Sequence, residues 1–231
     1  MKYLVANWKM NPGSAKAARA LAAAEAAASG KKSKIIICPP FVYIPELAAA
    51  KHKFDLGSQD IFWEDGGAHT GQISGPMLKA YNVKYAIIGH SEKRALGETD
   101  EQISRKVQAA LDNKITPLLC TGFGAEKGMA EEDVLAHIQR QLSADLRGAD
   151  CARVFVAYEP VWAIGTGKPA TPEHAERVCM FIKIKFGVKK ILYGGSTNSA
   201  NAAQFLFKEI DGLLVGGASL DKNEFVKMSL I

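Results

Sequence analysis

The sequence predicts an α/β fold, namely a closed (β/α)8 barrel in which residues 1–231 form a single domain. Short runs rich in β-branched residues alternate with longer helical stretches along the whole chain. Strict alternation of this kind is typical of parallel strands joined by crossover helices. The alternation occurs eight times, which is the number of units that closes the barrel, and the chain is longer than the minimum of about 200 residues.

The first half of the chain provides four of the expected strands. Residues 2–7 form an apolar run that predicts the first strand, and the alanine-rich stretch 15–29 predicts the helix after it. A second strand is expected at 34–38, where Pro39 and Pro40 end it because proline cannot donate to the sheet. The third and fourth strands are expected at 55–59 and 85–89.

In the second half, capping residues mark the helices. Thr99 and Gln102 have the spacing of a capping box, which predicts a helix to about Asn113. Thr171 followed by Pro172 combines an N-cap residue with proline at the first helical position, which predicts another helix. The remaining expected elements are strands at 115–120, 153–158, 190–193 and 213–215 and helices at 130–146 and from about residue 221.

An open, doubly wound parallel sheet would show the same alternation and is the alternative fold. Such a sheet usually carries a G-x-G-x-x-G turn after its first strand. Here Asn7-Trp8-Lys9 stands at that place. No linker or change in composition divides the chain, so the barrel is favoured.

Composition excludes several classes of protein. The chain is 48% hydrophobic and 23% charged, which is typical of globular proteins and unlike disordered or collagen-like chains. The cysteines are far apart and form no CxxC pair, so neither a disulfide framework nor a zinc or other metal site is expected. They are Cys38, Cys120, Cys151 and Cys179.

Charge and hydropathy limit the partners. The net charge of +5 is scattered, and no basic patch interleaved with aromatic residues indicates nucleic acid. No apolar stretch approaches the roughly 18 residues of a membrane helix. The apolar run 3–6 is too short for a signal peptide, so we expect a cytoplasmic protein. The mild positive charge is compatible with a small anionic substrate.

Catalytic groups of a (β/α)8 barrel lie just after the carboxyl ends of its strands. Asn7 and Lys9 follow the first strand, His90 follows the fourth and Glu159 follows the sixth. Three of them have plainer interpretations: His90 as a structural histidine, Glu159 as a surface carboxylate and Lys9 as a solvated lysine. His90 precedes a short expected helix, whose N-terminus disfavours an imidazolium, so a neutral His90 could donate a hydrogen bond. Glu159 could act as a base.

Glycine pairs follow the last two strands, at Gly194-Gly195-Ser196 and at Gly216-Gly217. This fold usually binds phosphate at these two places, because glycine lets backbone N–H groups approach an anion. The alternative is that both pairs are ordinary tight turns.

Residues 160–168 have the composition of a lid, with a proline at one end and two glycines at the other. A few such terminal residues can serve as the hinges of a closing segment. The alternative is an ordinary loop with an apolar tip.

Six segments resemble the triosephosphate isomerase family and occur in that family's order from end to end of the chain. They are residues 7–11 (NWKMN), 67–71 (GAHTG), 88–92 (IGHSE), 157–167 (AYEPVWAIGTG), 193–196 (YGGS) and 215–220 (VGGASL). The eleven residues around Glu159 are highly specific by themselves.

The resemblance implies that dihydroxyacetone phosphate and D-glyceraldehyde 3-phosphate are interconverted through an enediolate, in glycolysis and gluconeogenesis, without a cofactor. It implies that Glu159 is the base, that His90 is the neutral electrophile and that Lys9 holds the substrate and stabilises developing charge. The other substrate-binding residues that it implies are Asn7, Glu92, Gly165, Ser196, Gly216 and Gly217. The family also implies a homodimer that forms through the loop around Thr70.

The chain departs from the family in three respects. Phe123 stands where the family has a glutamate that accepts a hydrogen bond from the lid tryptophan, so we expect a weaker or different latch. Gln72 and Lys93 stand where the family has a charged pair across its dimer interface. We still expect the dimer to form without that pair. The helix after the sixth strand is expected to end early at Phe186-Gly187, and Lys183 is expected to pair with Asp211 in place of the family's arginine.

Two other functions stay open at this point. The chain could be an impaired barrel paralogue that serves as a binding or scaffold protein, since Phe123 and the interface changes could have cost the activity. It could also be another phosphate-binding barrel enzyme, such as a sugar-phosphate isomerase of amino-acid biosynthesis. The segment around Glu159 argues against the latter.

Overall fold

The computed structural model describes residues 1–27, 32–50, 53–163 and 170–231. Eight parallel strands form a closed barrel in sequence order, and β1 closes it by pairing with β8. The predicted (β/α)8 barrel is therefore confirmed. The strands are β1 (Lys2–Asn7), β2 (Ser33–Cys38), β3 (Asp55–Ser58), β4 (Tyr85–Ile88), β5 (Thr116–Thr121), β6 (Phe155–Tyr158), β7 (Lys190–Tyr193) and β8 (Gly212–Val215).

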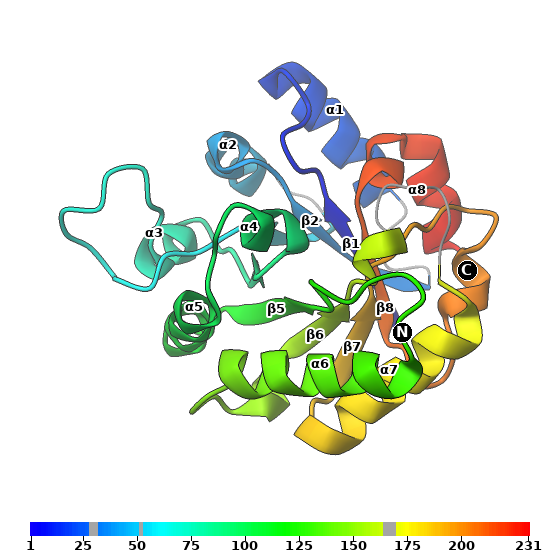
Figure 1. Cartoon of the computed structure of the whole chain (residues 1–231). Coiled ribbons are helices and arrows are strands. Elements are labelled where there is room, and N and C mark those ends of the chain that lie inside the picture. Colours follow the sequence, from blue (N-terminus) through cyan, green and yellow to red (C-terminus); the bar gives the residue numbers. More distant parts are fainter. Residues whose placement is uncertain (28–31, 51–52, 164–169) are drawn as a thin grey trace.

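The helices surround the strands, and the segment between β3 and α3 projects away from them (Figure 1). The helices are α1 (Ala15–Ala26), α2 (Ile44–Ala49), α3 (Gly75–Ala80), α4 (Ser91–Ala95), α5 (Asp100–Asp112), α6 (Glu131–Asp145), α7 (Pro172–Phe186) and α8 (Lys222–Ser229). Between β7 and β8 the helical segment is a short 3-10 helix, Ala202–Phe205. No helix in the described ranges is long and apolar enough to cross a membrane.

The predicted caps are present. The side chains of Thr99 and Gln102 form both bonds of a capping box at the start of α5. Thr171 caps α7 by accepting a hydrogen bond from the His174 backbone, and Pro172 is the first helical residue. Predicted strand ends differ from the observed ones by one or two residues. The largest difference is at β6, where a 3-10 helix at Cys151–Arg153 precedes the strand.

The apolar strand residues are buried on both faces of the barrel wall. Val5, Ile36 and Leu118 belong to a cluster inside the barrel, whereas their neighbours Leu4 and Ile35 pack against the surrounding helices. Residues of a strand point alternately to its two faces, so both sets must be apolar. This double burial explains why the strands are near-continuous apolar runs.

The amino end of the barrel confirms two further predictions. Helix α7 ends at Phe186, and Gly187 follows it in the left-handed region with φ 67°, which suits glycine. Lys183 Nζ lies 2.8 Å from Asp211 Oδ2. A second lysine, Lys190, lies 2.9 Å from Asp211 Oδ1, which the sequence did not indicate.

Candidate active site

A cavity of about 310 Å³ opens at the carboxyl ends of the strands. It brings together residues that are far apart in the sequence and includes most of the predicted site residues. Its lining consists of Asn7, Lys9, His90, Glu159, Gly194, Gly195, Ser196, Thr197, Asn198, Asn201, Leu214, Gly216, Gly217 and Ala218. Glu92 lies beside this cavity and contacts Lys9, whereas Gly165 falls outside the described residues.

Lys9 enters the cavity in an unusual backbone conformation. Its φ is 52°, which a non-glycine residue adopts only when its surroundings hold it there. The Lys9 N–H donates to Asn7 Oδ1 at 3.1 Å, and its C=O accepts from Gln59 Nε2 at 2.8 Å. Lys9 Nζ pairs with Glu92 Oε1 at 2.6 Å. Asn7 and Gln59 therefore fix the backbone from which the cation extends.

Gly216 gives the Lys9 side chain its space. A Cβ atom at position 216 would lie 3.3 Å from Lys9 Cε. A side chain at this position would crowd Lys9, so Gly216 leaves room for the cation. The absence of a side chain also leaves the backbone N–H groups of the glycine pair accessible to a ligand.

His90 is the N-cap of α4, and its ring has two different partners. Nδ1 accepts a hydrogen bond from the Glu92 backbone N–H at 3.2 Å. Because that N–H can only donate, the ring proton is assigned to Nε2 and the ring is neutral. Nε2 lies 3.2 Å from Glu159 Oε1. His90 thus presents an N–H donor to the cavity.

Glu159 is only 2% exposed and follows β6 directly. Its backbone N–H donates to the Thr121 C=O at 2.8 Å, which extends the pairing of β6 with β5 by one residue. Oε2 accepts from the Ser91 N–H at 3.1 Å, and Oε1 faces His90. The carboxylate is thus largely removed from water but retains two hydrogen-bond donors, which hold it in one orientation.

The loop after β7 lines the cavity beside Glu159. At Gly194 a Cβ would lie 2.9 Å from Glu159 Cγ, so only glycine fits beside the carboxylate. Asn201 Oδ1 accepts from the Asn198 N–H at 2.8 Å, and Asn201 Nδ2 donates to the Ser196 C=O at 3.3 Å. Asn198 and Asn201 were not among the predicted site residues. The asparagine-rich stretch after Ser196 is nevertheless a signal for a loop whose own side chains shape it.

The predicted lid begins with a 3-10 helix, Val161–Ala163, directly after Pro160. Trp162 packs partly buried against the core, and its ring lies 6.2 Å from that of His174. Residues 164–168 of the predicted lid fall outside the described residues. The Phe123 C=O accepts from His137 Nε2 at 2.6 Å, so α6 holds the backbone of Phe123.

Gln72 and Lys93, which we expect at a dimer interface, lie at the surface of the chain. Lys93 Nζ pairs with Asp60 Oδ2 of the same chain at 3.0 Å, and Gln72 is exposed. Within the described ranges, no group of three or more His, Cys, Asp or Glu side chains is arranged to hold a metal ion.

Comparison with known proteins agrees with this geometry. A family model described as triosephosphate isomerase matches residues 2–230. A triosephosphate isomerase of Synechococcus sp. (strain JA-2-3B'a(2-13)) is 40% identical over 97% of this chain and 94% of the relative. Those of Moorella thermoacetica and Acetivibrio thermocellus are 39% and 41% identical, and each alignment covers 96% of this chain and 95% of the relative. With its barrel and its cavity, the chain belongs to the triosephosphate isomerase family.

Proposed function

We propose that the chain is an isomerase that interconverts dihydroxyacetone phosphate and D-glyceraldehyde 3-phosphate. The observation that carries this proposal is the meeting of three groups in one cavity: the Glu159 carboxylate, the His90 Nε2–H and the Lys9 ammonium. A base, a neutral hydrogen-bond donor and a cation are what a proton transfer next to a carbonyl requires.

The reaction starts when Glu159 removes a proton from the substrate carbon beside the carbonyl. The electron pair of that C–H bond forms the carbon–carbon double bond of an enediolate, and negative charge develops on the carbonyl oxygen. The His90 Nε2–H stabilises this oxygen and can protonate it, while Lys9 provides a positive charge nearby. His90 gives its Nε2 proton to this oxygen and takes the proton of the hydroxyl on the neighbouring carbon, whose oxygen becomes the new carbonyl oxygen. Glu159 then returns its proton to the former carbonyl carbon, which completes the conversion of ketose to aldose.

The two glycine turns suit the phosphate of the substrate. We propose that Ser196, Gly216 and Gly217 bind it, together with Gly165, and that Asn7 and Glu92 keep Lys9 in place. Binding the phosphate at one end fixes the reacting carbons near Glu159, and the buried site limits attack by water on the intermediate. The residues of the chain supply every proton transfer, so we propose that no cofactor takes part.

We also propose a cytoplasmic homodimer that acts in glycolysis and gluconeogenesis. The segment around Thr70 supports the dimer, because it is exposed and projects from the barrel (Figure 1). We propose that residues 1–231 act as one domain and that nucleic acids and membranes are not partners.

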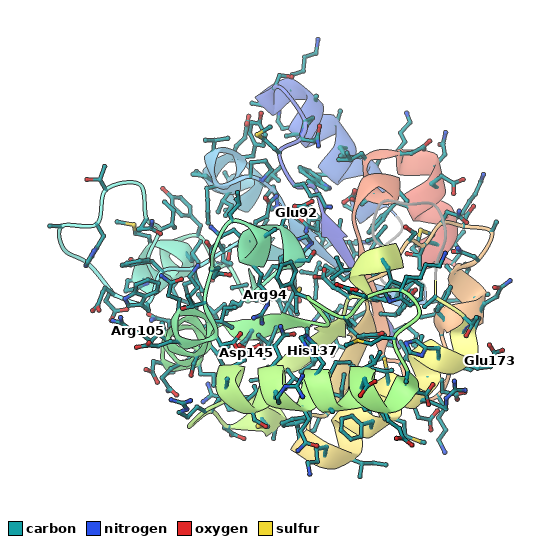
Figure 2. All side chains as sticks on the ribbon, in the orientation of Figure 1. Glu92, Arg94, Arg105, His137, Asp145 and Glu173 are labelled. Carbon is teal, nitrogen blue, oxygen red and sulfur yellow. The ribbon has the colours of Figure 1, made fainter. Side chains whose placement is uncertain are left out.

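The decisive experiment measures isomerisation of D-glyceraldehyde 3-phosphate by the wild-type protein and by Glu159→Gln. We expect rapid turnover that falls by at least about 10³-fold in the variant, because general base catalysis is lost. Glu173→Gln on α7 is the matched control, since that side chain lies at the surface (Figure 2) and does not line the cavity. A folded wild-type protein without turnover would contradict the proposal and favour the scaffold alternative.

A further inference from the structure

We propose that Arg94 is a positioning residue that sets the geometry between His90 and Glu159, with Asp145 as the residue that holds it. This inference rests on the proposed function. Arg94 does not line the cavity: its side chain is 3% exposed and points from α4 toward Asp145 on α6 (Figure 2). It therefore acts on the site only through the backbone that it binds.

The Arg94 guanidinium connects the ends of two strands that support the site. Its Nε donates to the C=O of Gly89, the residue directly before His90, at 2.9 Å. Its Nη2 donates to the C=O of Cys120 at 3.3 Å. Cys120 directly precedes Thr121, whose C=O accepts the backbone N–H of Glu159 at 2.8 Å. One planar group thus joins the peptide before the histidine to the strand that anchors the glutamate.

Helix α4 contacts the glutamate as well. Its N-cap is His90, and the N–H of its first residue, Ser91, binds Glu159 Oε2 at 3.1 Å. The position of this short helix therefore determines both the 3.2 Å distance from His90 Nε2 to Glu159 Oε1 and the direction of the carboxylate. A helix of five residues has little stability of its own, so contacts outside it must hold it in place.

Asp145, the last residue of α6, holds the Arg94 guanidinium in place. Its Oδ2 accepts from Arg94 Nη2 at 2.5 Å, and the side chain is fully buried. Asp100 Oδ1 accepts from Nη1 at 2.7 Å, but Asp100 is 47% exposed. A buried ion pair contributes little net stability compared with apolar groups of similar size. Its directional bonds instead specify the place and orientation of α4.

The test replaces Arg94 with lysine. A single ammonium cannot bind Gly89, Cys120 and the two aspartates together, so α4 is expected to shift. A displacement of about 1 Å in an active site can cost about 10²-fold in rate. We therefore expect kcat per folded molecule to fall by 10- to 100-fold, while KM changes less than threefold because the phosphate contacts stay intact.

Arg153→Lys is the matched control. Arg153 is exposed at the opposite end of the barrel, and its guanidinium donates to the Leu111 C=O at 2.8 Å. The Arg153→Lys variant therefore loses the same type of hydrogen bond far from the cavity. Asp145→Asn is the second variant, in case Arg94→Lys does not fold. It keeps an acceptor for Nη2 but removes the charge, and we expect a fall in kcat of about threefold to tenfold.

A second measurement separates this inference from the proposed function. The His90 Nε2 proton is followed by NMR, and we expect it to be protected from solvent exchange in the wild type and in Arg153→Lys but not in Arg94→Lys. This readout does not need turnover, so it tests the positioning role even if the wild-type protein fails to isomerise the triose phosphate. Unchanged kcat per folded molecule together with an unchanged His90 signal in a folded Arg94→Lys or Asp145→Asn protein would overturn the inference.

Discussion

Two aspartates at the amino end of the barrel and the cavity glutamate at its carboxyl end have different partners. At the amino ends of the strands, Asp55 and Asp211 each lie between two lysines, at distances of 2.6 to 2.9 Å. At the carboxyl ends, the buried Glu159 faces a neutral imidazole and one backbone N–H, and the cavity lysine pairs with Glu92 instead.

This difference appears in the titration of the amino-end aspartates. Burial alone would raise the pKa of Asp55, but hydrogen bonds from Lys34 and Lys84 hold it below its ordinary value. Burial likewise opposes the hydrogen bonds from Lys183 and Lys190 that lower the pKa of Asp211. Ionised carboxylates at this end stabilise the fold, whereas a buried carboxylate without a cation is available for chemistry. Asp55 and Asp211 thus serve stability, whereas Glu159 serves reactivity.

The strongest test of this comparison moves the Glu159 carboxylate without removing it. Glu159→Asp shortens the side chain by one methylene, which withdraws the carboxylate by about 1 Å from the substrate and should cost about 10²-fold in kcat. The melting temperature should stay within a few degrees of the wild type, since Glu159 forms no ion pair with a lysine or arginine of the described residues. A variant that retains full kcat would show that Glu159 is not the base.

The residues at the strand ends could be predicted from the sequence because the fold fixes their place. Once strands and helices alternate eight times, Lys9, His90 and Glu159 must follow strands at one end of the barrel. The end of α7 at Phe186 could be predicted because Gly187 permits the left-handed conformation that stops a helix. These are local properties, and the sequence carries them directly.

The supporting residues could not be predicted in this way. Gln59 binds the Lys9 backbone 50 residues away, and Asp145 binds Arg94 across 51 residues. Nothing in the local pattern around either residue distinguishes it from a surface side chain. Their roles depend on strand register and helix packing, which only the folded chain provides. Lys190 is a similar case, because register alone brings it beside Asp211.

The second prediction tests whether a carboxylate at the amino end of the barrel contributes to stability alone. Asp211→Asn removes the charge between Lys183 and Lys190, so we expect a loss of about 2 kcal/mol in the free energy of unfolding, with kcat unchanged. Urea unfolding and turnover of the same preparation measure both quantities. Lys189→Gln, beside Lys190, is a control that should change neither, because no ion pair with Lys189 exists among the described residues.

The pH dependence of that loss has a definite sign. Because the folded pKa of Asp211 is lower than its ordinary value, the unfolded chain binds its proton first as the pH falls. The stabilisation is therefore present above the ordinary pKa of about 4 and disappears as the pH falls through the folded pKa. The difference between wild type and Asp211→Asn should shrink below that range. A difference that grew in acid would contradict this assignment.

The smallest expected effect concerns a carboxylate that pairs with no lysine among the described residues and does not line the cavity. Glu25 on α1 is fully buried, and its Oε1 accepts a hydrogen bond from Trp8 Nε1 at 3.1 Å. Trp8 directly precedes Lys9 in the chain. Burial raises its pKa to about 8, against the smaller opposite effect of the Trp8 hydrogen bond. The folded chain therefore keeps the proton that the unfolded chain releases near its ordinary pKa of about 4. Stability from this group is full below that value and declines up to the folded pKa.

Glu25→Gln keeps an acceptor for Trp8 and removes the titration. We expect the variant to be more stable than the wild type by at least about 1 kcal/mol at pH 8, and the gain to vanish near pH 4. Urea unfolding at several pH values measures this gain, and turnover at each pH checks that Lys9 stays in place. An equal effect at both pH values would mean that packing around Trp8, not the buried charge, determines the stability. Ionisation of the buried Glu25 carboxyl would then cost the fold less free energy than its raised pKa implies.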